Sequence, residues 1–419
     1  MQCIIQAVSK KGCVEMNAAR LLKQVIRYTQ YHILWPAVYA SACKDPVDSK
    51  KVLFADSFAG SLTDNMEAVK VAMLSKDPDL KFAEVLAPSK SGNKIVKRVK
   101  AELKTLEFFR EYATAGTLIL TETYLPAYAV KRRKETQVIQ LWHACGAFKK
   151  WGYSTLDSEF GASRKTAKKF PMHNCYTLVP VSSEACIGPY SEAFRCDPHI
   201  VQPLGTPRTD IFFDAEFVSG SREAICRWYE EQHTHAQHQK LEPIIRNKKI
   251  ILYAPTFRGE NISSAHFETP LDLEALHEKF GREYVFLYKL HPYAKDGFAV
   301  PESCKNFAFN ITGSPADEAL CAADVLITDY SSMIFEYSLL ERPVILYAYD
   351  LDSYIKERNF YFPYKEFAPG PVAETQEQLI SALEDISSSF NADKINEFKD
   401  KFMSACDGHS AERIADKIL

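Results

Sequence analysis

The sequence predicts an α/β protein made of two doubly wound Rossmann-like domains that face each other across a cleft. Three observations lead to this fold class. Short apolar runs suited to strands buried on both faces alternate with amphipathic helical stretches in the first half of the chain, and the same alternation restarts in the second half. A polar connection separates the two series, and 419 residues are enough for two domains of roughly 200 residues each.

Glycine and proline punctuation places the division between the domains. The stretch PLGTPRTD at residues 203–210 suits a crossover, and residues 219–248 read as a helix followed by a polar connection. We therefore predict an N-terminal α/β domain at residues 1–215, a C-terminal α/β domain at residues 216–395, and a last helical segment at residues 396–419 that packs back on the first domain.

The first half carries a helix and then alternating strands and helices. Residues 14–35 have a helical pattern with a mixed apolar and basic face. Short apolar runs predict strands at residues 52–55, 82–86, 117–120, 138–142 and 179–181, with helices at residues 66–74 and 94–110. The polar and basic stretch 149–170 has few residues to bury, so we expect a surface loop with helical parts over the cleft.

The second half repeats this alternation. Strands are predicted at residues 249–254, 284–290, 325–327 and 344–347, and helices at residues 271–280, 375–387 and 393–418. Between the last two strands, Ile334, Tyr337 and Leu340 share one helical face. Residues 323–350 are therefore predicted to form one βαβ unit.

Composition limits the classes of function. The formal net charge of -3 gives no overall case for nucleic-acid binding, and 46% hydrophobic with 25% charged residues argues against disorder and against a membrane-spanning class. Eleven scattered cysteines without a C-x-x-C pair favour reduced thiols in a cytosolic protein. The N-terminal apolar core is too short for a signal peptide and no later run approaches the length of a membrane span, so we expect a cytoplasmic location.

Polar clusters recur at the carboxyl ends of predicted strands, where a cleft between two such sheets would be lined. In the first half, the strand at 138–142 leads to His143, in a turn made by Gly146 and followed by Lys149. A histidine alone is more often structural, but the glycine and lysine beside it make His143 an equal candidate for a general base.

Two further clusters follow strands of the second half. Thr256 and Arg258 come after residues 249–254 and offer a hydroxyl and a planar guanidinium to phosphate oxygens, with a surface ion pair as the alternative. Lys289 and His291 lie on the same side of their strand because side chains alternate with a period of two. This alternation directs both cationic groups into one site.

The fourth cluster, Asp329 to Ser332, precedes the helix of the βαβ unit. A helix N-terminus favours anions, although Asp, Ser and Ser are first of all capping residues at such a place. Glu336 would accept ribose hydroxyls if it faces the cleft, and Arg208 in the crossover adds a cation.

Together the clusters supply two histidines, several fixed cations and a helix N-terminus, without a G-x-G-x-x-G fingerprint or a P-loop. Such a site suits a nucleoside diphosphate donor. The cations would hold the diphosphate and stabilise the departing oxygen, while one histidine would take the proton from an attacking hydroxyl.

Five motifs in the stretch from Val52 to Tyr364 resemble, in the same order, the CDP-glycerol glycerophosphotransferases of teichoic-acid synthesis, bacterial enzymes with a two-domain GT-B fold. The motifs are WHACGAFKKWG, PLGTPRTD, LYAPTFRG, YKLHPY and ITDYSSMIFEYSLLERPVILY. The resemblance implies that His143 is the general base and that His291 assists at the donor phosphates. The implied substrate-binding residues are Trp142, Gly146, Lys149, Arg208, Pro255, Thr256, Arg258, Lys289, Asp329, Ser331, Ser332 and Glu336.

The resemblance also implies a reaction and partners. An acceptor hydroxyl would attack the polyol-bearing phosphate of a CDP-polyol, forming a phosphodiester and releasing CMP. The acceptor would be a lipid-linked saccharide or a growing polyol-phosphate polymer at the inner face of the cell membrane, with residues 1–215 on the acceptor side and 216–395 binding CDP-polyol. The basic loop at 149–169 and the helices near Tyr28 would serve peripheral membrane docking.

The sequence gives little support for a bound metal ion. Mg²⁺ is plausible with any diphosphate donor, but no acidic cluster in the sequence demands it. His233, His235 and His238 have no acidic or cysteine partner beside them, so a solvated helix surface is favoured over a metal site.

One departure from the family pattern leaves the polyol open. Many glycerol-transferring members have glycine directly after the histidine of the WH motif, whereas Ala144 stands here, so ribitol phosphate is an alternative to glycerol phosphate. Two other classes compete. A GT-B glycosyltransferase acting on a nucleotide sugar would release a nucleoside diphosphate, and a binding protein without catalysis would not need His143.

Overall fold

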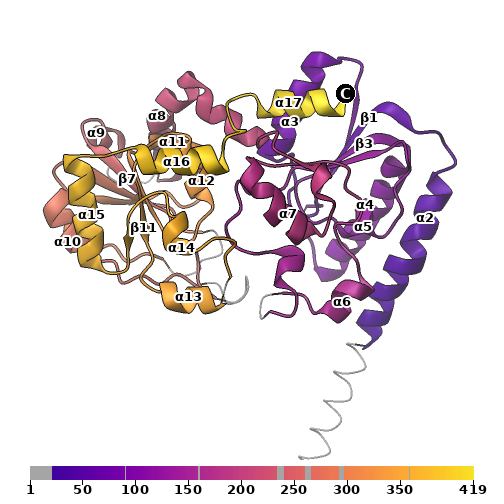
Figure 1. The fold of residues 1–419 in the computed structure, drawn as a ribbon, viewed down its shortest axis with the longest axis horizontal. Helices are drawn as coiled ribbons and strands as arrows, with labels where there is room; N and C mark the ends of the chain where they lie inside the picture. Colours follow the sequence, from indigo (N-terminus) through magenta and orange to yellow (C-terminus); the bar gives the residue numbers. More distant parts are fainter. Residues whose placement is uncertain are drawn as a thin grey trace, which may run out of the picture.

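The computed structural model describes residues 21–89, 91–158, 161–233, 240–259, 266–291, 297–357 and 359–419. Two α/β bodies lie side by side, one built mainly from each half of the chain, and both sheets are parallel (Figure 1). The predicted fold class, two doubly wound domains, is confirmed.

The first sheet has the strand order β2-β1-β3-β4, and every neighbouring pair in it is parallel. Its strands are β1 (Asp48–Ala55), β2 (Lys81–Val85), β3 (Ala115–Leu120) and β4 (Gln137–Gln140). A bridge between Ile139 and Leu178 continues it toward the parallel pair β5 (Val179–Pro180) and β6 (Val201–Gln202). All six residues of β3 are buried, which explains why its sequence is uniformly apolar or small.

Helices cover this sheet on both faces. They are α2 (Trp35–Ala42), α3 (Asp64–Lys76), α4 (Lys94–Thr114), α5 (Leu125–Tyr128), α6 (Arg164–Lys169) and α7 (Ile187–Phe194). The side chains of Thr63 and Asn93 cap α3 and α4 by accepting hydrogen bonds from backbone N–H groups of the first turn. The predicted loop at 149–170 contains a 3₁₀-helix, Gly152–Thr155, as well as α6.

The second sheet has the order β12-β11-β10-β7-β8-β9, again with parallel neighbours. Read from its far edge, this is the Rossmann order 3-2-1-4-5-6, with the reversal of direction between β7 and β10. The strands are β7 (Lys249–Tyr253), β8 (Tyr284–Tyr288), β9 (Ala308–Asn310), β10 (Val325–Thr328), β11 (Val344–Tyr347) and β12 (Val372–Ala373).

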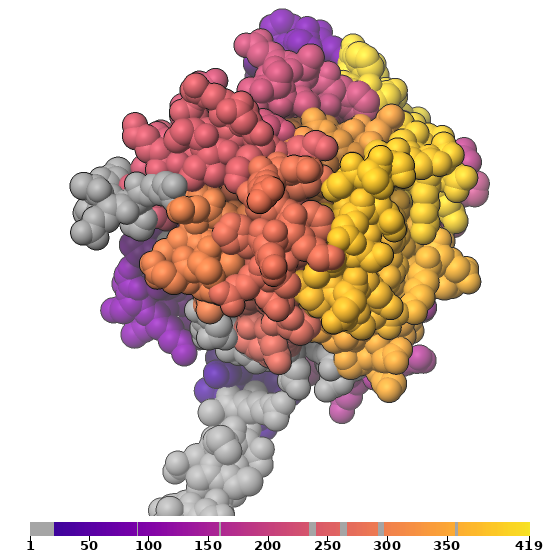
Figure 2. Space-filling model, turned by 90° about the vertical axis from the view of Figure 1, so that its left-hand side faces the viewer, coloured from indigo at the N-terminus to yellow at the C-terminus, as the bar shows by residue number. Residues whose placement is uncertain are grey.

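The helices of the second half cover that sheet and form most of the face seen in Figure 2. They are α8 (Ala215–Gln232), α9 (Glu242–Ile245), α10 (Leu273–Phe280), α11 (Ala316–Ala322), α12 (Met333–Ser338), α13 (Leu351–Glu357), α14 (Tyr364–Phe367), α15 (Gln376–Ser388) and α16 (Asp393–Phe402). The last helix, α17 (Ser410–Ile418), packs on the first sheet instead.

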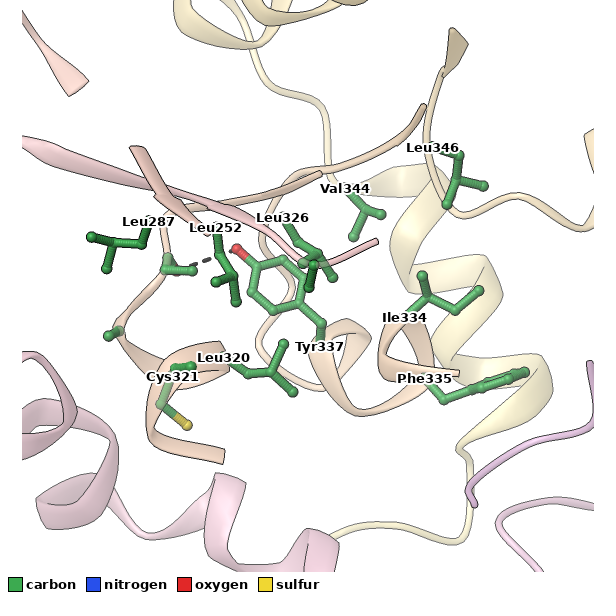
Figure 3. Packing of buried hydrophobic residues seen from close by; sticks show 14 of the residues in the cluster. Leu252, Leu287, Leu320, Cys321, Leu326, Ile334, Phe335, Tyr337, Val344 and Leu346 are labelled. Carbon is green, nitrogen blue, oxygen red and sulfur yellow. Dashed lines mark hydrogen bonds between the residues drawn. The ribbon is translucent and has the colours of Figure 1, made fainter. Parts of the chain in front are cut away.

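Helix α12 packs on the second sheet as its apolar face requires. Tyr337 points toward Leu252 and Leu326 of the sheet, and its hydroxyl donates a hydrogen bond to the carbonyl of Ala323 at 3.2 Å (Figure 3). Ile334 on the same helix is also fully buried. This confirms the predicted βαβ unit β10-α12-β11, and it fixes the loop before α12 at the carboxyl edge of the sheet.

The single helix predicted at 393–418 is wrong. Residues 403–409 interrupt it between α16 and α17, and Gly408 in this turn has φ of 89°, a conformation that ends a helix. Helix α17 then lies beside α3 (Figure 1), where Ile414 and Ile418 join the core of the first sheet and Asp416 pairs with Lys76 at 2.7 Å.

The helix predicted at 14–35 lies partly outside the described residues. From residue 21 the chain is helical, and the helix continues through a π-turn at Gln30–Leu34 into α2, well past the predicted end. Among the described residues, no helix combines the length and apolar character needed to cross a membrane. The nine cysteines in that part of the chain are all free thiols.

Candidate active site

His143 follows β4 and forms a hydrogen-bonded pair with Glu122, which comes just after the neighbouring strand β3. The Nδ1 atom of His143 lies 2.9 Å from Oε1 of Glu122, and the two side chains are 49% and 28% exposed. A carboxylate at Nδ1 favours the tautomer with the proton on that nitrogen and leaves the lone pair on Nε2. The pair therefore has the arrangement of an oriented general base that opens to solvent.

Two buried amide side chains hold the turn after β4. Trp142 has φ of 58°, a left-handed conformation that is uncommon for an aromatic residue. The side chain of Gln140 accepts a hydrogen bond from the N–H of Trp142 at 3.0 Å and donates to the carbonyl of Glu122 at 3.2 Å. Asn65 donates to the carbonyl of Trp142 at 3.0 Å and accepts from the N–H of Arg208 at 2.9 Å. The turn is thus fixed on both sides of Trp142.

A pocket of about 190 Å³ opens beside the histidine. Its walls include Trp142, His143, Gly146 and Lys149 from the first half and Ser332 from the second half. Five of the predicted site residues therefore meet around one cavity, although they come from both halves of the chain.

Gly146 allows the two halves to approach closely at this pocket. Its φ is 62°, and a Cβ atom there would lie 2.2 Å from the ring of Phe335 on α12. Its N–H donates to the hydroxyl of Ser182 at 3.1 Å. Both the backbone conformation and the space available require glycine at this position.

In the second half, Thr256 and Asp329 stand at the reversal point of the sheet, after β7 and β10. Asp329 accepts hydrogen bonds from the N–H and the hydroxyl of Thr256 at 2.8 and 3.0 Å. Arg258 lies 2.9 Å from Asp329 and 2.6 Å from Asp350. The carboxylate of Asp329 is buried, so these contacts tie together the two loops where such a sheet binds its ligand.

The guanidinium of Arg258 is therefore occupied. Its Nε and Nη2 atoms contact Asp350, and its Nη1 contacts Asp329 and the carbonyl of Thr256. The sequence suggested either a phosphate contact or a surface ion pair, and the structure has a largely buried ion-pair network. Direct contact of Arg258 with a phosphate would require breaking part of this network.

Arg208 and Glu336 pair with each other across the two halves. Glu336 is nearly inaccessible, because its side chain is 4% exposed. Its second oxygen is buried without a hydrogen-bond partner among the described residues. The expected ribose contact of Glu336 therefore does not follow from its position. Nearby, burial raises the pKa of Asp317 to about 6, while Arg208 opposes that shift.

Lys289 and His291 stand at the end of β8. Lys289 Nζ donates to the carbonyl of Ser314, and burial lowers the pKa of this lysine. The pKa of His291 is lowered by burial and also by the positive charge of Lys149, which belongs to the first half. Its position just after β8 thus places His291 within the electrostatic reach of a residue that lines the pocket beside His143. Pro292 of the same motif lies outside the described residues.

The remaining predicted residues hold the loops in place. Pro255 is buried directly after β7, and the hydroxyl of Ser331 accepts a hydrogen bond from the N–H of Met333 at 3.3 Å. His233 Nδ1 lies 2.8 Å from the carbonyl oxygen of Tyr229, whereas His235 and His238 fall outside the described ranges. Across those ranges, no three His, Cys, Asp or Glu side chains gather as possible metal ligands.

Sequence reasoning missed Glu122, Gln140, Asn65 and Asp350. Glu122 had a usable signal, because it follows the predicted strand at 117–120 and parallel neighbours end at the same edge of a sheet. The others had none, since a buried amide or carboxylate is assigned a partner only by the tertiary fold.

Two facing Rossmann-like domains make up a GT-B-type fold, and the histidine–carboxylate pair lies at a pocket lined by both halves. The sequence profile of the CDP-glycerol:poly(glycerophosphate) glycerophosphotransferases matches residues 37–419, and the chain belongs to this family. It is an enzyme of the polyol-phosphate transferase type that this family comprises.

Relatives in the family differ in the polyol named and in length. The chain is 38% identical to the teichoic acid ribitol-phosphate primase of Bacillus spizizenii strain W23, over 89% of this chain and 92% of that protein. It is 31% identical to the teichoic acid glycerol-phosphate primase of Bacillus subtilis strain 168, over 72% of this chain and 73% of that protein. A match at 36% identity to the poly(ribitol-phosphate) polymerase of B. spizizenii spans only 57% of that protein.

A solved structure is similar over nearly the whole fold. The wall teichoic acid polymerase TagF superposes with a TM-score of 0.69 at 21% identity, covering 96% of this chain and 97% of that chain. At this identity the likeness establishes the GT-B fold alone.

Proposed function

We propose that this enzyme transfers ribitol phosphate from CDP-ribitol to a hydroxyl of a teichoic-acid-type acceptor and releases CMP. The oriented pair His143–Glu122, opening into a pocket walled by both halves, is the observation that carries the proposal. The choice of ribitol over glycerol rests on the ribitol-phosphate primase, which matches over 92% of its length at higher identity than the glycerol-phosphate primases.

In the proposed mechanism His143 acts as the general base. With its Nδ1 proton held by Glu122, Nε2 accepts the proton of the acceptor hydroxyl. The hydroxyl oxygen attacks the polyol-bearing phosphorus, a new phosphodiester forms, and the bond from that phosphorus to the bridging oxygen breaks so that CMP carries away the electron pair. The positive charge of Lys149 offsets the negative charge on the leaving oxygen, and the imidazole of His291, whose pKa is lowered, offers a hydrogen bond to the same phosphates.

The other predicted residues are assigned to the donor by position. Thr256, Ser331 and Ser332 stand at the carboxyl edge of the second sheet, at or beside the reversal between β7 and β10, where Rossmann-like sheets bind nucleotides. Asp329 and Arg258 keep these loops in place rather than touching the donor. An Mg²⁺ ion brought with the diphosphate stays a prediction to be tested by chelation.

The acceptor in this proposal is a lipid-linked saccharide or a polyol-phosphate chain, and the enzyme works in the cytoplasm at the inner face of the cell membrane. Helix α4 exposes Ile95, Val99 and Leu103, and the neighbouring helix exposes Leu22 and Val25. Exposed apolar side chains on helices that also carry lysine and arginine suit peripheral contact with an anionic membrane. Flotation with anionic vesicles tests this location, and failure to float at low salt would remove it.

The test of the reaction is CMP release from CDP-ribitol and, separately, CDP-glycerol, each with a lipid-linked saccharide acceptor. We expect acceptor-dependent CMP with CDP-ribitol, and a loss of at least about 100-fold in His143→Ala. His199→Ala is the matched control, because His199 also pairs with a carboxylate but is 94% exposed. CMP from CDP-glycerol alone would replace ribitol by glycerol, and a nucleoside diphosphate released from a nucleotide sugar would replace the reaction by glycosyl transfer.

A further inference from the structure

A second cavity, of about 510 Å³, adjoins the pocket beside His143. Lys149 and Trp151 line both cavities, so the two lie next to each other. We call the second one the lysine groove. One wall is formed by residues 149–152, Ser154, Thr155 and Ser158, and the other by Ile355 and Lys356 of α13 together with Asn359.

Backbone contacts between the two halves fix the walls of the lysine groove. The N–H of Lys150 donates to the carbonyl of Asn359 at 2.9 Å, and Lys149 forms a β-bridge with Phe360. The groove is therefore a feature of the folded backbone and does not depend on side-chain positions alone.

The lining of the groove has one sign of charge. Lys149, Lys150 and Lys356 line it, and among the residues that the structure describes no aspartate or glutamate does. No carboxylate lies within ion-pair distance of these lysines among the described residues, although most other buried or half-buried cations of the site are paired. Lys149 and Lys150 lie over the rings of Tyr354 and Tyr361, which leaves their charge uncompensated by an anion.

Unpaired lysines around a groove that leads to a reaction pocket attract a negatively charged, extended ligand. We propose that the lysine groove binds the phosphodiester backbone of the acceptor chain, and this inference rests on the function proposed above. In this arrangement the donor occupies the loops of the second sheet and the terminal hydroxyl of the acceptor reaches His143. The rest of the acceptor chain then extends from the pocket along the lysine groove. Each lysine then contacts phosphate oxygens behind the reacting end.

The experiment measures binding of a fluorescently labelled poly(ribitol phosphate) oligomer to the full-length enzyme in the absence of donor. We expect Lys150→Glu combined with Lys356→Glu to weaken binding at least about tenfold, and the salt dependence of binding to become shallower. CDP-ribitol affinity should stay unchanged. Lys417→Glu is the matched control, because Lys417 is an exposed lysine on α17, which lies at the top of Figure 1 whereas α13 lies at the bottom.

Unchanged oligomer affinity in the double variant, with an unchanged thermal midpoint, would overturn the inference. Should the double variant lose its fold, Lys150→Gln combined with Lys356→Gln gives the same comparison without introducing negative charge. Loss of binding to anionic phospholipid vesicles, with oligomer binding intact, would assign the lysines to a membrane surface instead.

Turnover separates this inference from the proposed function. With acceptors of increasing length, KM should fall in the wild type but not in the double variant, while kcat is kept. If no CDP-polyol yields CMP but the oligomer still binds through these lysines, the reaction is wrong and the groove stands. If CMP forms and KM for long acceptors is unaffected by the double variant, the groove is wrong and the reaction stands.

Discussion

Replacing Glu122 by glutamine removes one charge beside His143 and keeps the length of the side chain. In the proposed mechanism the imidazole becomes positive as it takes the proton, 2.9 Å from the carboxylate. A unit charge pair at such a distance is stabilised by between about 1.4 and 6 kcal/mol, from fully hydrated to half-buried surroundings. Because the two side chains are 49% and 28% exposed, the lower part of this range applies. At about 1.4 kcal/mol for each factor of ten, kcat should fall about 10- to 100-fold.

The assay is steady-state CMP release at saturating acceptor, with KM for the CDP-polyol measured in parallel. KM should change little, because Glu122 acts through His143 and does not reach the donor loops. The control is Asp197→Asn, which breaks a similar pair with His199 at 2.8 Å on the exposed surface and should leave kcat unchanged. A Glu122→Gln enzyme with the wild-type kcat would refute the stabilisation of the positive imidazole by the charge of Glu122.

Three further predictions concern stability and are checked by urea unfolding. Gly146→Ala should lower the free energy of unfolding by at least about 2 kcal/mol, because of backbone strain and contact with the ring of Phe335. Adding Phe335→Leu should recover part of this loss. Gly188→Ala is the control and should be nearly neutral, because open space surrounds Gly188. Arg258→Ala should lower the free energy of unfolding by about 3–5 kcal/mol, because it leaves the carboxylates of Asp329 and Asp350 unpaired. A raised KM for the donor at unchanged stability would instead mean that Arg258 contacts a phosphate directly. Burial lowers the pKa of His173 from 6.5 to about 3, so the unfolded chain takes up the proton first and stability falls as the pH drops through this window. Relative to His173→Asn, the wild type should lose about 1.4 kcal/mol per pH unit between roughly pH 6 and 4, and parallel curves would contradict this.

The fold was predictable where the chain buries long uniform stretches. The strands β3 and β10 are continuous apolar runs because both faces of a parallel sheet are covered, and such runs are visible in the sequence. By contrast β6 and β12 are two residues long and β9 is three, too short to form a pattern. The break between α16 and α17 was missed because the amphipathic pattern resumes after it on a different partner, the core around α3.

The sequence predicts where the site residues lie, but it does not predict which of them form ion pairs with each other. Strand ends identify which polar residues stand at the cleft, and they correctly bring His143, Lys149 and Ser332 to one pocket. Whether a cationic side chain forms an ion pair with a carboxylate or remains available to a ligand depends on contacts between distant segments. Arg258 is taken up by Asp329 and Asp350, 71 and 92 residues away in the chain.

The division between paired and unpaired cations is itself informative about function. An arginine held by a buried carboxylate positions loops, because releasing it to bind a ligand would leave buried negative charge uncompensated. A lysine with no carboxylate within reach keeps its full attraction for a phosphate that arrives from solvent. In this enzyme the arginines Arg208 and Arg258 belong to the first kind, and Lys149 with its neighbours in the groove belongs to the second. Recognition of phosphate is therefore expected to depend on the lysines, and the arginines to set the geometry in which the lysines act.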